Sequence, residues 1–158
     1  MIASRSAWAA TRGVADTNPT GTSAAVLVDT GVLVALFNRD DPQHVAVTAW
    51  LARCTAALHT VEAVLSETAF FLPARLRPAL AGLAHSGVLQ THAPDTAGHG
   101  RMAQLFEKYR DQDPDWADIA LVWLAEHTGI RRIATLDVTD FSVYRIQGRR
   151  RFELELLR

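Results

Sequence analysis

The sequence predicts one α/β domain, a three-layer α/β/α sandwich with a mostly parallel central sheet. Short apolar, β-branched runs that are typical of buried strands alternate with longer segments of helical periodicity. Strands that alternate with helices form parallel sheets covered on both faces. A chain of 158 residues is long enough for one domain with its own core. We place this domain at residues 25–158, after a flexible N-terminal extension at residues 1–24 that is rich in Gly, Pro, Ser and Thr.

The first half of the domain is expected to run strand, helix, helix, strand, helix. The run "AVLV" is a buried strand that ends at Asp29, and "TGVLVALFN" continues as a helix. A second helix covers about 42–54, with Asp41 as its N-cap before a proline at the first helical position. The run "ALH" is a short strand. The next helix, "TVEAVLSETAFFL", starts near Thr60 and is stopped by Pro73.

The second half repeats the same alternation. A helix over about 78–85 leads to the strand "VLQTHA", and another helix covers 96–110. The helix in "DQDPDWADIALVWLAEHTG" is expected to begin after Asp113 and to end at Gly129. The run "RRIATLD" is a strand that ends in an acid, and "FELELL" alternates like a last edge strand.

Composition excludes several classes of protein. The chain has 16 Lys and Arg against 17 Asp and Glu, a balance unlike that of a protein that binds nucleic acid by bulk charge. No apolar run is long enough for a membrane-spanning helix, and the N-terminus lacks the features of a secretory signal. The lone Cys54 can form neither an internal disulfide nor a cysteine metal cluster. We therefore expect a cytoplasmic protein without a membrane partner.

Four acids occupy positions that a purely structural sequence would avoid. Asp29 and Asp137 each follow a buried strand, at the sheet edge where ligand sites form in open α/β folds. Glu67 lies in the middle of an apolar helix, and Asp118 lies in the first turns of another. Carboxylates gathered there repel one another and are costly to desolvate, so a bound cation is the natural compensation. Taken singly, Glu67 could face solvent and Asp118 could be a favourable charge near a helix N-terminus.

Other interpretations of these acids are weaker. Asp115 lies three residues before Asp118 on the same helical face, so it is an accessory candidate. A phosphatase of the haloacid dehalogenase type needs a second aspartate two residues after the first, and that position is Gly31. A receiver domain needs a lysine after a later strand, but the only lysine, Lys108, precedes the Asp118 helix.

The stretches "VLVDTGVLVALFNRDDPQH", "VLSETAFFL" and "DWADIALVWLAEHTGIRRIATLDVTDFSVYR", in this order, resemble PIN-domain ribonucleases, and within that family the VapC toxins of bacterial toxin–antitoxin pairs. The resemblance covers about residues 25–145. It implies a set of catalytic, metal-binding acids: Asp29, Glu67, Asp118 and Asp137. Thr135 stands where the family often has Ser or Thr. Asp140 is a further acid in the same loop, and some members replace the fourth acid.

The activity that the resemblance implies is metal-dependent hydrolysis of RNA phosphodiester bonds. Oxygen ligands without paired Cys or His suit Mg²⁺ (or Mn²⁺) rather than zinc, with one ion or two. The expected partners are RNA, a cognate antitoxin protein and a second copy in a homodimer. The candidates for phosphate contacts are Arg39, Arg75, Arg77, Arg101 and Arg149–Arg151. The alternative is a non-catalytic PIN-like module that binds RNA or protein.

Overall fold

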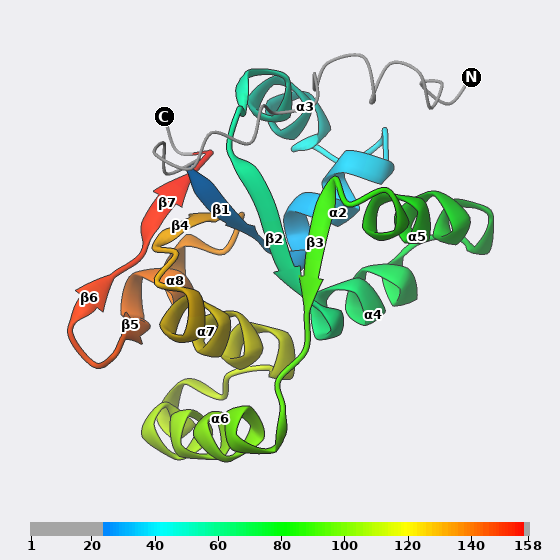
Figure 1. Cartoon of the computed structure of the whole chain (residues 1–158). Helices are drawn as coiled ribbons and strands as arrows, with labels where there is room; N and C mark the ends of the chain where they lie inside the picture. Colours follow the sequence, from blue (N-terminus) through cyan, green and yellow to red (C-terminus); the bar gives the residue numbers. More distant parts are fainter. Residues whose placement is uncertain (1–23, 157–158) are drawn as a thin grey trace, which may run out of the picture.

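A five-stranded parallel sheet forms the centre of the molecule and is flanked by helices (Figure 1). The computed structural model describes residues 24–156, so the extension predicted at residues 1–24 lies, except for Ala24, outside the described residues. In spatial order the strands are β3 (Leu89–His92), β2 (Ala57–Val61), β1 (Ala25–Val28), β4 (Arg132–Ala134) and β7 (Glu153–Glu155). The predicted fold class is confirmed.

The helices of the first half follow the predicted order but two of them begin later. They are α2 (Thr30–Phe37), α3 (His44–Arg53), α4 (Glu62–Phe71) and α5 (Arg77–His85), the last preceded by the 3₁₀ turn η1 (Ala74–Leu76). Asp41 is not the cap of α3, because its carboxylate accepts the Gln43 N–H at 2.8 Å in the preceding turn. Helix α4 begins at Glu62, two residues after the predicted start near Thr60, because Thr60 belongs to β2 and its hydroxyl donates to Val28 O at 2.7 Å.

The second half contains α6 (Thr96–Lys108), the 3₁₀ turn η2 (Arg110–Gln112), α7 (Trp116–Thr128) and α8 (Val138–Val143). Asp113 does not cap α7. It ends η2 in the left-handed conformation, with φ of 48°. The cap is Asp115, whose Oδ1 accepts the Asp118 N–H at 2.7 Å. The predicted end at Gly129 is confirmed by its φ of 78°, a conformation that glycine adopts without steric cost.

Helix α7 contains the longest run of consecutive buried residues among the described residues. Its residues 117–125 are all buried, between the sheet on one side and α6 on the other. The opposite face of the sheet, which includes Val28, Leu58 and Leu89, packs against α2, α3 and α5. Because α7 is apolar all round, a carboxylate on it loses its hydration when the chain folds. Within residues 24–156, no helix is long and apolar enough to cross a membrane.

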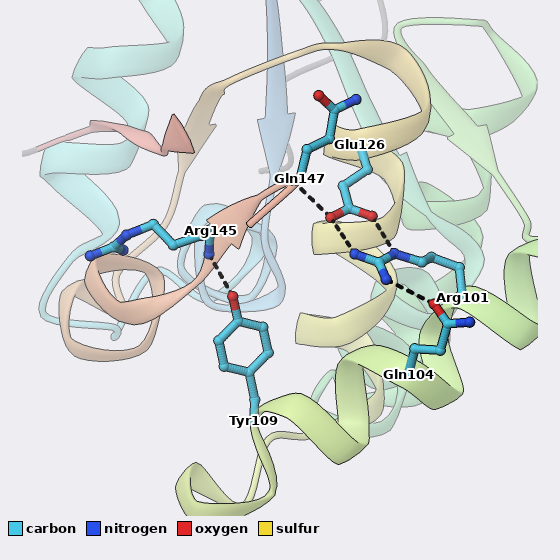
Figure 2. A network of polar contacts seen from close by, with 6 residues as sticks. All are labelled: Arg101, Gln104, Tyr109, Glu126, Arg145 and Gln147. Atoms are coloured by element: carbon cyan, nitrogen blue, oxygen red, sulfur yellow. Dashed lines mark hydrogen bonds and ion pairs between the residues drawn. The ribbon is translucent and has the colours of Figure 1, made fainter. Parts of the chain in front are cut away.

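A polar network joins α6 and α7 to the hairpin of β5 (Arg145–Ile146) and β6 (Arg150–Arg151) (Figure 2). The Arg101 guanidinium donates to both oxygens of Glu126, at 2.7 and 3.0 Å. Glu126 also accepts the Gln147 N–H at 2.8 Å, and the Tyr109 hydroxyl accepts the Arg145 N–H at 2.9 Å. Arg101, a candidate for a phosphate contact, is therefore engaged in holding the hairpin against α6 and α7.

Candidate active site

An open cavity of about 640 Å³ lies at the carboxyl ends of β1 and β4. Side chains from α2, α4, α7 and the start of α8 form its wall. The acids on this wall are Asp29, Asp41, Glu67, Asp115, Asp118 and Asp137. The fold thus brings the four predicted acids and the accessory Asp115 to one place, and adds Asp41, which the sequence analysis treated as a helix cap.

Asp29 is buried where β1 passes into α2, with 7% of its surface exposed. Its Oδ1 accepts the Thr30 N–H at 2.6 Å, and its Oδ2 accepts the Thr135 hydroxyl at 2.7 Å. Burial raises the pKa of Asp29 to about 6, and repulsion from Asp115 and Glu67 adds to the rise. The two hydrogen bonds lower the pKa and offset part of this effect. The carboxylate is therefore held in one orientation, in surroundings that disfavour its charge.

Asp118 lies in the first turn of α7 and is equally buried, at 7% exposure. Burial is the main cause that raises its pKa to about 8, and repulsion from Asp115 and Asp29 adds to it. The fully buried Tyr144 hydroxyl donates to Asp118 Oδ2 at 3.2 Å. The pKa of that phenol is itself raised, by burial and by Asp118, so it remains a donor. Near neutral pH, Asp118 is fully ionised only if a cation compensates its charge.

Glu67 is half-buried in the middle of α4 and lines the cavity. Its Oε2 accepts the Thr30 hydroxyl at 2.9 Å. Thr30 therefore contacts two acids at once, Asp29 through its N–H and Glu67 through its hydroxyl. The sequence analysis missed Thr30, although its position directly after the strand-end acid was a usable signal.

Asp137 lies on the cavity wall as the N-cap of α8, where it accepts the Asp140 N–H at 2.9 Å. Thr135 connects this residue to Asp29, since its hydroxyl accepts the Asp137 N–H at 2.9 Å while donating to Asp29. Asp140 is not among the residues that line the cavity. Burial and the nearby Asp137 raise its pKa.

The donor set of the cavity suits a hydrated divalent ion. In the part of the chain that the structure describes, no three Asp, Glu, His or Cys side chains are grouped closely enough to hold an ion by themselves. Mg²⁺, however, retains several waters and is usually bound through one or two carboxylates. Burial, with added repulsion between the acids, raises the pKa values of Asp29 and Asp118 and so disfavours their ionised forms, which a bound divalent ion would stabilise. The residues present therefore fit Mg²⁺ or Mn²⁺.

A groove adjoins the acidic cavity and shares Val34 and Phe71 with it. Its volume is about 1080 Å³, and its wall includes Arg39 and Arg75, two of the candidates for phosphate contacts. Arg77 is instead hydrogen-bonded to α4, because its Nε donates to Ala69 O at 2.9 Å. Two of the predicted basic residues thus lie beside the acids.

Comparison with known proteins identifies similar sequences and folds. A family model for the PIN domain matches residues 26–146, a range that includes Thr135 and every acid predicted for the site. Ribonuclease VapC26 of Mycobacterium tuberculosis is 33% identical over 132 residues, which are 80% of this chain and 97% of that protein. The crystal structure of M. tuberculosis VapC20, a toxin that cleaves the sarcin-ricin loop, superposes with a TM-score of 0.68 at 20% identity. That superposition covers 73% of this chain and 92% of VapC20, so the two share their fold.

Proposed function

The chain belongs to the PIN domain family and, on that premise, we propose that it is a VapC-type ribonuclease that hydrolyses RNA with the help of Mg²⁺ or Mn²⁺. The single observation that carries the proposal is the convergence of Asp29, Glu67, Asp118 and Asp137 on one cavity at the carboxyl edge of the sheet. Two of these acids are buried and have raised pKa values, as expected for groups that bind a cation. No observation favours the non-catalytic alternative.

We assign Asp29 and Asp118 as the principal metal ligands, with Glu67 and Asp137 completing the acidic set. When bound, a divalent ion supplies the charge that activates a water for attack and that neutralises the phosphate. Two neighbouring hydroxyl groups donate hydrogen bonds to these ligands. Thr135 fixes the orientation of the Asp29 carboxylate, and Tyr144 donates to the Asp118 carboxylate. Hydrogen bonds of this kind to ligands commonly tune metal affinity.

The RNA backbone approaches a strongly acidic cavity, which repels phosphate in the absence of the ion. We propose that Arg39 and Arg75, in the adjoining groove, bind neighbouring phosphates. The shared residues Val34 and Phe71 make the groove continuous with the acids. An RNA strand that lies along the groove therefore reaches the proposed metal site.

The same groove is the site that we propose for a cognate antitoxin. Its wall is largely apolar and includes Leu36, Phe37, Leu72 and Leu76, a surface suited to an amphipathic helix or an extended segment. An antitoxin bound there occupies the route of the RNA and so prevents cleavage. We also expect a homodimer, which sedimentation of the purified protein would detect.

Incubation of the purified protein with single-stranded RNA tests the proposed function. We expect cleavage with Mg²⁺ or Mn²⁺ and none after chelation. Intact RNA under all of these conditions, from a protein shown to be folded, would reject it.

A further inference from the structure

An exposed tryptophan stands beside the proposed active site. Trp116 opens α7, directly after the cap Asp115, and 56% of its surface is exposed. Its ring packs against those of Phe106 and His99, with distances of 5.6 Å and 6.3 Å between the ring centroids. A large aromatic ring in a fixed position at the surface leaves one apolar area in contact with water, a common feature of binding sites.

Trp116 lines a second cavity, which the proposed mechanism does not use. This cavity has a volume of about 620 Å³, within the range of sites for small ligands. Glu67 and Asp115 lie on its wall and also on the wall of the acidic cavity, so the two cavities adjoin. The rest of the wall combines small apolar residues with a few polar ones, and includes Ala93, Pro94, Ala117, Glu62, Ser66 and His99.

We propose that this second cavity binds one unpaired nucleobase of the RNA substrate, stacked on the indole of Trp116. The inference rests on the proposed ribonuclease function, since it places the base next to the phosphate that is cleaved. Proteins commonly bind single-stranded RNA by stacking its bases on exposed aromatic side chains. The substrate chain then passes from the acidic cavity, which takes the phosphate, to the adjoining cavity, which takes the base.

The charge of the second cavity favours a base over a phosphate. Its acids, Glu62, Glu67 and Asp115, repel phosphate but can accept hydrogen bonds from N–H groups. Adenine, cytosine and guanine each carry an exocyclic amino group that donates two such hydrogens, whereas uracil has no amino group and offers only its single N3–H. We therefore expect a base with an exocyclic amino group at this position in preference to uracil.

Substitution of Trp116 tests the stacking. Trp116→Leu keeps an apolar side chain beside Phe106 but removes the aromatic face, and kcat/KM for a short single-stranded RNA should fall about 5- to 150-fold, the effect of losing one base–aromatic stack. Trp116→Phe should retain most of the activity. The matched control is Phe70→Ala, which removes an aromatic ring that is 79% exposed on α4 and lines neither cavity.

Removal of single bases from the RNA provides a second measurement, in which each protein is compared with itself on intact and abasic RNA. Abasic substitution at one position beside the cleaved bond should slow the wild type as much as Trp116→Leu does, and should have no further effect on that variant. The inference would be overturned if the abasic substitution slowed cleavage equally in both proteins, or if Trp116→Leu were as active as the wild type. Either result would leave the ribonuclease proposal intact. A wild type that cleaves no RNA would reject the underlying function instead.

Discussion

The Thr135 hydroxyl donates to Asp29 Oδ2 at 2.7 Å, a contact between residues 106 positions apart in the chain. The same hydroxyl accepts the Asp137 N–H at 2.9 Å, so one threonine positions two of the cavity's acids. Thr135 is 1% exposed and does not line the cavity. Its effect on the reaction is therefore expected to be through the orientation of Asp29.

Loss of this hydrogen bond should weaken metal binding. In Thr135→Val the shape is nearly kept, but Asp29 loses a donor, and the affinity for Mn²⁺ should fall about 10- to 100-fold, as for other residues that orient metal ligands. Titration calorimetry with Mn²⁺ measures the change. Thr135→Ser retains the hydroxyl and should bind Mn²⁺ nearly as well as the wild type. Equal affinities for the Val and Ser variants would show that the contact has no effect on the site.

The stability of the metal-free protein should fall as the pH rises. The pKa of Asp118 is about 8 in the folded chain against 3.8 for a free side chain, so between these values the native state binds more protons than the unfolded state. The free energy of unfolding therefore decreases across this range, by at least ~2 kcal/mol if each pKa unit is worth about 1.4 kcal/mol. Urea denaturation at about pH 5 and about pH 8 measures the difference.

Two controls assign this pH dependence to the acidic cavity. Asp118→Asn cannot ionise, so its stability should change much less over the same range. Saturating Mn²⁺ should stabilise the wild type mainly at the higher pH, because the ion binds the ionised carboxylates. A metal-free wild type that gains stability relative to Asp118→Asn between about pH 5 and about pH 8 would contradict the raised pKa of Asp118.

Tyr144 should set the pH at which the enzyme becomes active. Its hydrogen bond lowers the pKa of Asp118, so in Tyr144→Phe that pKa should rise further, and the acidic limb of the pH–rate profile should move to higher pH. The matched control is Tyr109→Phe, since the Tyr109 hydroxyl accepts from Arg145 N outside the cavity. Both changes remove a buried hydroxyl and should cost about 1 kcal/mol of stability. Identical pH profiles for the two variants would exclude this role of Tyr144.

Two glycines of α6 should respond to alanine in opposite directions. A Cβ on Gly98 would lie 2.8 Å from both Pro94 Cβ and Trp123 Nε1, whereas a Cβ on Gly100 would meet nothing within 4 Å. Gly98→Ala should therefore destabilise the protein by about 1–3 kcal/mol through overpacking. Gly100→Ala should stabilise it by up to about 1 kcal/mol through helix propensity. Thermal denaturation compares the two, and a Gly98→Ala variant as stable as Gly100→Ala would show that α6 and α7 are less tightly packed than described.

The order of the five sheet strands and of helices α2 to α7 could be predicted because each of them carries its own local pattern. Helix α8 and the hairpin of β5 and β6 were not predicted. The start of α7 could not be predicted, because in "DQDPD" an aspartate stands directly on each side of Pro114, and either one could cap a helix. The rule that proline favours the first helical turn selected Asp113, yet the backbone turns left-handed there and Asp115 forms the cap. The proline rule alone therefore does not distinguish between these two caps.

The acids of the site stood out in the sequence because the pattern places each carboxylate where its desolvation or repulsion costs free energy. Their partners did not: Tyr144 is an ordinary residue until the fold brings it to Asp118, and Thr30, although it directly follows Asp29, shows its contact with Glu67 only in the structure. The second cavity was likewise hidden, because α4 and α7 are far apart in the chain. That the acids bind metal and catalyse cleavage stays a prediction.

The most direct measurement is the rate of RNA cleavage by Asp29→Asn with saturating Mg²⁺ or Mn²⁺. Asparagine keeps the size of the side chain and an oxygen that can accept the Thr30 N–H as a helix cap, so the fold should be retained, which circular dichroism can verify. Because the charge that holds the ion is lost, the rate should fall by at least about 100-fold. Cleavage by a folded Asp29→Asn variant at the wild-type rate would contradict the assignment of this cavity as the active site.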